Sequence, residues 1–122
     1  MLLTAAALMF LLGLAHSLLG ERYLLVRLFR RRDLPTLFGG SWFTTRTLRF
    51  AWHLTTVIAW GLAAVVLQLG QLPNAAGRGI AITLAITLLL SGLLPLLFTR
   101  GRHLSWVVLF AAGTLVLLWA LR

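Results

Sequence analysis

The sequence contains no cysteine and no lysine, and its only acidic residues are Glu21 and Asp33. Without cysteine, the chain can form no disulfide, hold no iron–sulfur cluster and supply no thiolate nucleophile. With only two carboxylates, the sequence alone shows no strict set of nucleophile, base and acid. Whether the protein is an enzyme stays open at this stage.

Apolar residues dominate what remains. They make up 61% of the 122 residues, and the mean hydropathy is +0.99, which is typical of integral membrane proteins. All eleven basic residues are arginines, and the formal net charge is +9. Most of these arginines flank apolar stretches, so we expect them to contact anionic lipid headgroups rather than nucleic acid.

Four stretches are apolar over about the 20 residues that a membrane-spanning helix needs. Because four such runs cannot close a barrel, the fold class is predicted to be all-α, with a single domain over residues 1–122. The prediction is one bundle of four transmembrane helices with a basic interfacial loop at 21–47. The predicted spans cover residues 2–20, 48–69, 79–98 and 103–121.

Arginines are unevenly distributed between the connections. Seven lie between residues 22 and 49 and two more in the turn 99–102, whereas the connection after residue 70 carries one. The positive-inside rule then places the first two segments in the cytoplasm and both termini on the extracytoplasmic side. The predicted location is the inner membrane of a bacterial-type cell.

Polar residues recur at helical spacing within the first two spans. In the second span, they follow steps of three and four along one stripe: Arg46, Arg49, His53, Thr56 and Trp60. In the first span, one face carries Gly13, His16, Ser17, Gly20 and Glu21. Because lipid disfavours such faces, we expect them to turn inward and satisfy each other.

All three histidines fall at one predicted membrane depth, near the cytoplasmic ends of three different spans. Together with Glu21, His16, His53 and His103 form a plausible ligand set for zinc, iron or copper. The sequence has no pair of histidines at metal-ligand spacing on one helix. The predicted metal site therefore depends on how the helices pack.

A haem b group is a second interpretation of the same cluster, with two histidines as axial ligands. Trp52, Trp60 and Trp106 would supply walls for the ring. Arg46, Arg49 and Arg102 would hold an anionic group, which is a propionate, a substrate or a lipid phosphate.

A structural role is the alternative. The histidines and Glu21 then serve as hydrogen-bond and ion-pair partners between helices, and the arginines extend to lipid phosphates. On this interpretation the protein is a non-enzymatic accessory or assembly protein of the membrane. Small residues spaced four apart, Gly13/Ser17 and Ala59/Ala63, allow close helix contacts within the chain, in a homo-oligomer or with a membrane partner.

Overall fold

The computed structural model describes residues 1–72 and 74–122 and shows an all-helical chain, without strands in these ranges. The first helix continues from α1 through a π-helical segment, η1, into the short α2. The elements are α1 (Leu2–Leu19), η1 (Gly20–Leu25), α2 (Val26–Leu28), α3 (Trp42–Leu69), α4 (Ala75–Phe98) and α5 (Ser105–Ala120). The predicted count of four long helical segments is confirmed, with the α1–η1–α2 helix counted as one.

Three of these segments are long and apolar enough to cross a membrane: Leu2–Leu28, Trp42–Leu69 and Ala75–Leu97. The fourth, α5, is equally apolar but only 16 residues long. At a rise of about 1.5 Å per residue, α5 is shorter than a typical hydrocarbon core of about 30 Å. The architecture is that of a helical, membrane-compatible protein.

The helices extend beyond the predicted membrane spans on both sides of the basic loop. The first helix runs eight residues past residue 20, and α3 begins at Trp42, before the predicted span that starts at residue 48. Residues 29–41 lie between these two helices, so about half of the predicted loop 21–47 is helical. Hydropathy marks where the apolar stretch stops, but arginine favours the helix and lets it continue into the interface.

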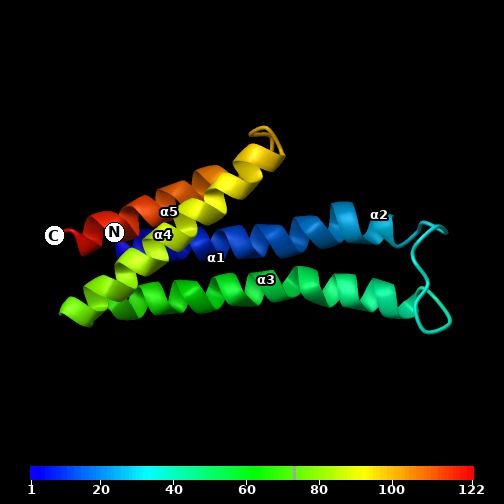
Figure 1. Ribbon diagram of the computed structural model, residues 1–122, viewed down its shortest axis with the longest axis horizontal. Helices are drawn as coiled ribbons and strands as arrows, with labels where there is room; N and C mark the ends of the chain where they lie inside the picture. Colours follow the sequence, from blue (N-terminus) through cyan, green and yellow to red (C-terminus); the bar gives the residue numbers. More distant parts are fainter. Residues whose placement is uncertain (73) are drawn as a thin grey trace.

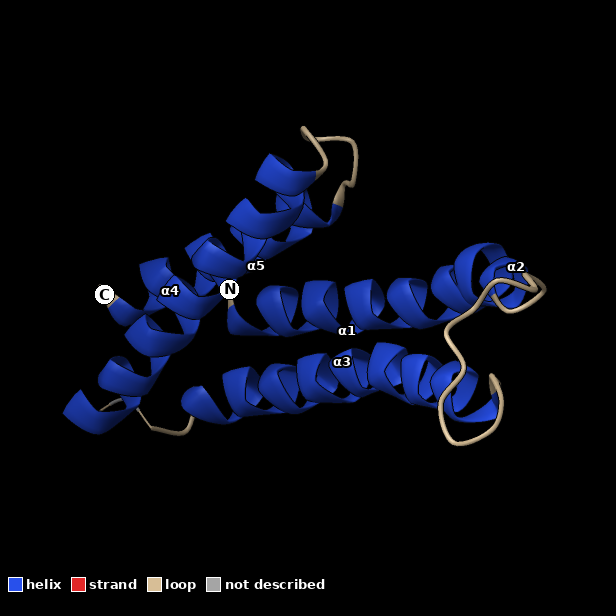
Figure 2. Ribbon diagram, turned by 45° about the vertical axis from the view of Figure 1, so that its right-hand side comes forward, coloured by secondary structure: helices blue, strands red, loops and turns tan. Residues whose placement is uncertain are grey.

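Two helical hairpins build the molecule. Figure 1 and Figure 2 show α1 beside α3 in one hairpin, while α4 and α5 form the other. The hairpins cross near the chain termini, where α1 also packs against α5, and they diverge toward the turn that joins α4 to α5. The arrangement is therefore a wedge of two hairpins, more open than the single bundle that was predicted.

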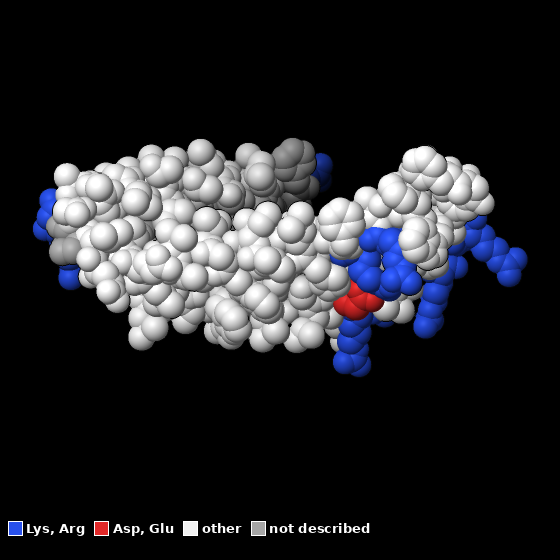
Figure 3. All heavy atoms as spheres, turned by 90° about the horizontal axis from the view of Figure 1, so that it is seen from below, with Lys and Arg blue, Asp and Glu red and all other residues white. Residues whose placement is uncertain are grey.

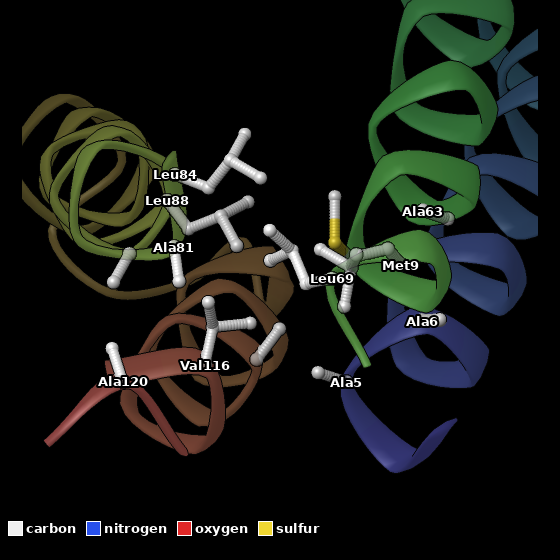
Figure 4. Close-up of a cluster of buried hydrophobic side chains, with 13 residues drawn as sticks. Ala5, Ala6, Met9, Ala63, Leu69, Ala81, Leu84, Leu88, Val116 and Ala120 are labelled. Atoms are coloured by element: carbon white, nitrogen blue, oxygen red, sulfur yellow. The ribbon is translucent and has the colours of Figure 1, made fainter. Parts of the chain in front are cut away.

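Small side chains fill the crossing of the hairpins (Figure 4). Among the large side chains, Val66, Leu69 and Val116 are the most fully buried. Alanines let the backbones approach closely, as is common where helices meet in membranes. The buried cluster consists of Ala5, Ala6, Met9, Ala63, Val66, Leu69, Ala81, Leu84, Ala85, Leu88, Ala112, Val116 and Ala120.

Candidate functional site

A polar cluster joins the first helix to α3, and we call it the polar clasp. Its members are Ser17, Glu21, Arg49, His53 and Thr56. Residues 49, 53 and 56 share the predicted stripe of α3, and residues 17 and 21 share the predicted face of the first helix. The inward orientation of both faces is therefore confirmed for the clasp.

Glu21 is the charged centre of the clasp. Arg49 Nη2 lies 2.9 Å from Glu21 Oε1, and Arg49 Nε donates to Glu21 Oε2 at 3.2 Å. His53 Nε2 lies 3.3 Å from the same Oε2. Glu21 therefore interacts with both basic side chains of the clasp, which lowers the cost of placing its charge between apolar helices.

Hydroxyl groups extend the clasp toward the interior. Ser17 Oγ lies 2.7 Å from His53 Nδ1 and 2.9 Å from Thr56 Oγ1. Thr56 Oγ1 also lies 3.3 Å from the carbonyl oxygen of Gly13. The clasp therefore runs from the surface to the interior: the Arg49 side chain at one end is 41% exposed, and Thr56 at the other end is 3% exposed.

Thr56 limits how the protons of the clasp can be arranged. Its hydroxyl donates to the Gly13 carbonyl, and in the bond between Ser17 and Thr56 either hydroxyl can be the donor. The direction of the bond between Ser17 and His53 depends on which ring nitrogen of His53 carries a proton.

Two tryptophans of α3 flank the clasp and hydrogen-bond to the backbone of α1. Trp52 Nε1 donates to the His16 carbonyl at 3.0 Å, and Trp60 Nε1 donates to the Phe10 carbonyl at 3.1 Å. Each indole packs on a glycine of the first helix, which provides the space for it. A Cβ at Gly20 would lie 2.2 Å from Trp52 Nε1, and one at Gly13 would lie 2.8 Å from Trp60 Nε1.

Glu21, the carboxylate of the clasp, lies in the π-helical segment η1. This segment begins at Gly20, and the N–H of Val26 bonds to the Glu21 carbonyl five residues earlier. A π turn widens the helix and changes the direction of the side chains that follow it. Such turns occur often at functional sites, and here the turn coincides with the clasp.

His16 belongs to a separate contact beside the clasp. Its ring stacks on Trp52 with 4.3 Å between centroids and 6° between planes. Its Nε2 lies 3.0 Å from Thr55 Oγ1, while that hydroxyl donates to the Trp52 carbonyl at 2.7 Å. His16 and His53 thus have different partners on α3.

The remaining predicted site residues lie apart from the clasp. His103 Nδ1 lies 2.7 Å from Ser105 Oγ, and Trp106 Nε1 donates to the Gly101 carbonyl at 3.1 Å, so both bond within their own hairpin. The guanidinium of Arg46 lies 5.6 Å from the ring of Trp42. Arg102 is exposed in the turn between α4 and α5.

The predicted metal and haem sites have no support in this arrangement. Within residues 1–72 and 74–122, no three histidine or acidic side chains gather so as to hold a metal ion. Among the four predicted ligands, only His53 and Glu21 are within hydrogen-bond distance of each other. His16 is held against Trp52 and His103 against Ser105. The physical reason is that helical spacing fixed a common depth but not a common direction for the rings.

Sequence reasoning gave Ser17 and Thr56 no functional role, although both are clasp members. The signal was present, since Ser17 lies four residues before Glu21 and Thr56 three residues after His53. The structure also brings Ser17, His53 and Glu21 into contact across two helices, which one sequence cannot show.

The end of the molecule beyond the clasp is strongly basic. Figure 3 shows arginines gathered at this end, with acidic atoms among them, and an uncharged middle on the face in view. Aromatic rings lie among these charges. Tyr23 has Arg22 and Arg27 at 5.5 and 5.8 Å from its ring centroid. Arginines mixed with tyrosine and tryptophan are typical of a membrane interface.

Asp33 forms the only described acidic contact in the loop after α2. Arg31 Nε donates to Asp33 Oδ1 at 2.9 Å, and Arg31 Nη2 lies 2.6 Å from Oδ2. This hydrogen-bonded guanidinium lowers the pKa of Asp33 to about 2. Both side chains are exposed, so the pair organises the loop more than it stabilises the fold.

In comparisons with known proteins, the chain matches no protein-family model, no curated protein and no solved structure.

Proposed function

We propose that this protein is a non-enzymatic accessory or assembly component of a bacterial-type inner membrane. In this role the polar clasp fixes α1 against α3, and the arginine-rich end binds anionic lipid headgroups. The hydropathy of the chain and its three long apolar helices support the membrane location.

The observation that carries the proposal is the internal pairing of the clasp. Each clasp side chain has a partner within the clasp, and the described residues contain no buried side-chain nitrogen or oxygen without a hydrogen bond. Polar side chains that satisfy each other across two helices stabilise helix association in membranes. A binding centre for a polar ligand would instead present unsatisfied groups to that ligand.

Lipid contact is supported by the net positive charge of the arginine-rich end. Between residues 21 and 49, seven arginines stand against two acids, and both acids are already paired. A basic residue near an anionic bilayer surface contributes about 1 kcal/mol of attraction. The excess charge therefore favours a bilayer leaflet rich in anionic lipid.

The test compares thermal unfolding in two bilayers. The protein is placed in nanodiscs of phosphatidylcholine alone and of phosphatidylcholine with phosphatidylglycerol. We expect a higher melting temperature in the anionic bilayer, and a smaller gain for the Arg27→Gln/Arg46→Gln double variant. Arg78→Gln, at the N-terminal end of α4, is the control and should keep the full gain. Equal gains in all three proteins would contradict lipid binding by the basic end.

A second candidate is acyl transfer, and it rests on one specific observation. Ser17 Oγ bonds to His53 Nδ1, and the other ring nitrogen faces Glu21, which is the order of nucleophile, base and orienting acid in serine hydrolases. Two features argue against acyl transfer. The first is that Ser17 Oγ also hydrogen-bonds to Thr56 Oγ1. Ser17 also lies inside a helix, whose backbone N–H groups are bonded to carbonyls and cannot bind an oxyanion.

A fluorophosphonate probe separates the two candidates, because it labels activated serines covalently. If acyl transfer is the function, the wild-type protein is labelled and Ser17→Ala is not, whereas Ser41→Ala, in the loop, keeps its label. If the wild-type protein is not labelled, or if Ser17→Ala is still labelled, acyl transfer by Ser17 is contradicted and the clasp serves only to hold the two helices together.

A further inference from the structure

The wedge between the two hairpins contains an open cavity of about 280 Å³ that the clasp does not use. All four long helical segments line it. The lining is apolar apart from the hydroxyls of Thr55 on α3 and of Thr87 and Ser91 on α4. Thr55 also holds His16, so the cavity reaches the level of the stacked His16–Trp52 pair.

The open side of the wedge is basic. The turn between α4 and α5 carries Arg100, Arg102 and His103, all exposed, and lies where the hairpins are farthest apart (Figure 1). Neither arginine forms an ion pair with an acid in the described part of the chain. The apolar cavity and the basic turn thus lie in the same wedge.

The size of the cavity limits what can enter. A helix with its side chains is about 10–12 Å across, so a helix from a second copy or a partner would have to force the hairpins apart. A single acyl chain is far thinner and matches the apolar lining. The charge at the opening then selects an anionic headgroup over a zwitterionic one, because the opening offers unpaired guanidinium groups.

We infer that the wedge is a binding site for one anionic phospholipid, with an acyl chain in the cavity and the phosphate at the turn between α4 and α5. Arg100 and Arg102 bind the phosphate. Ala59 of α3 and Ser91 of α4 both line the cavity, and their small side chains leave room for the chain. This site is distinct from the general attraction of the α1–α3 basic end to an anionic surface.

Native mass spectrometry of the detergent-purified protein tests the site. The probe is an equal mixture of phosphatidylglycerol and phosphatidylcholine with identical acyl chains. We expect one retained phosphatidylglycerol per chain, with a preference of roughly fivefold for each arginine that contacts the phosphate. Arg102→Gln should reduce the preference by about that factor, whereas Arg78→Gln should leave it unchanged.

Filling the cavity tests where the acyl chain lies. Ala59→Leu extends a side chain into the cavity from α3, and Ser91→Leu does so from α4, so either folded variant suffices if the other fails to fold. Both should lose the retained lipid while keeping their helical circular dichroism. Ala51→Leu, at an exposed position of α3 outside the cavity, is the matched control and should retain it.

Three results would overturn the inference. They are equal retention of both lipids, a retained lipid in folded Ala59→Leu or Ser91→Leu, and a dimer that replaces the lipid and is lost in these variants. The outcome is independent of the proposed function. The nanodisc test depends on Arg27 and Arg46, whereas the wedge depends on residues of α4, the following turn and the inner face of α3.

Discussion

At the scale of single residues, Glu21 accounts for the position of its neighbours. An unpaired carboxylate between apolar helices is costly, and Glu21 interacts with both Arg49 and His53. His53 in turn connects Glu21 to the hydroxyl of Ser17. Removing one member therefore leaves the others with unsatisfied polar groups, which costs more than the lost contact alone.

His53→Ala tests this dependence. It removes two side-chain hydrogen bonds between α3 and the first helix, each worth about 0.6–1.7 kcal/mol in a membrane. We expect the free energy of unfolding to fall by about 1–3 kcal/mol. Reversible unfolding in mixed micelles measures it. Ser17→Ala/His53→Ala should cost less than the sum of the single variants, and strict additivity would deny the coupling.

His16→Ala addresses the stacked pair beside the clasp. The variant loses one hydrogen bond to Thr55 and the stacking on Trp52, so we expect a loss of about 1 kcal/mol. Bound metal and the visible spectrum should equal those of the wild type. A fall in stoichiometric metal or haem in the variant would revive the metal hypothesis and assign His16 to it.

Asp33 supplies a prediction about pH. Its pKa is lowered to about 2 by Arg31, from an ordinary value of 3.8. Because the pKa is lowered in the folded protein, the ion pair contributes its full stabilisation above pH 3.8. This stabilisation is lost as the pH falls toward 2. NMR titration of the Asp33 carboxyl carbon should give a midpoint near 2, and near its ordinary value in Arg31→Gln. Because the pair is exposed, Asp33→Asn should leave the melting temperature almost unchanged.

At the scale of elements, the contact of the first helix with α3 depends on glycine. Gly20→Ala places a methyl group 2.2 Å from Trp52 Nε1, so the indole must move and its bond to the His16 carbonyl is strained or lost. We expect a destabilisation of about 1–3 kcal/mol, typical of overpacking. Gly61→Ala on α3 is the control, because no atom lies within 4 Å of the added methyl group.

The Gly61→Ala control should cost nothing and gain up to about 1 kcal/mol from helix propensity. Thermal unfolding of both variants in one detergent compares them directly. A loss in Gly61→Ala as large as that in Gly20→Ala would show that glycine matters for helix flexibility rather than for the tryptophan contact.

The sequence was sufficient to predict the number of helices and the inward faces of the first two. Hydropathy located the apolar runs, and steps of three and four identified the stripe that carries Arg49, His53 and Thr56. These features depend only on local spacing. They were predictable because helical periodicity places residues on a face whatever the partner helix is.

The pairing across helices could not be predicted in this way. The sequence placed three histidines at one depth, but the choice of partner depends on how the helices are rotated and crossed. Ser17 faces His53, and His16 faces Trp52 and Thr55. The π segment at Gly20 also left no clear sign in the apolar pattern, although it reorients the helix where Glu21 stands.

At the scale of the whole molecule, the two hairpins differ in what holds them together. The first helix and α3 share hydrogen bonds and an ion pair, whereas α4 and α5 pack through Gly92 and Gly113 against apolar side chains. The hairpins meet at an alanine-rich crossing near the termini. Polar contacts therefore hold one hairpin together, and close apolar packing holds the other.

The orientation of the whole molecule in the membrane is the last prediction. Seven arginines between residues 22 and 49, and two in the turn 99–102, predict that both segments face the cytoplasm, because translocating clustered basic residues is unfavourable. A C-terminal alkaline phosphatase fusion should then be active, and a C-terminal green fluorescent protein fusion should be dark. The same reporters inserted after Gly39, in the loop between α2 and α3, should give the opposite result. A fluorescent C-terminal fusion would invert the topology. It would then place the wedge opening on the outer side of the membrane, where the headgroup bound by Arg100 and Arg102 would have to come from the outer leaflet.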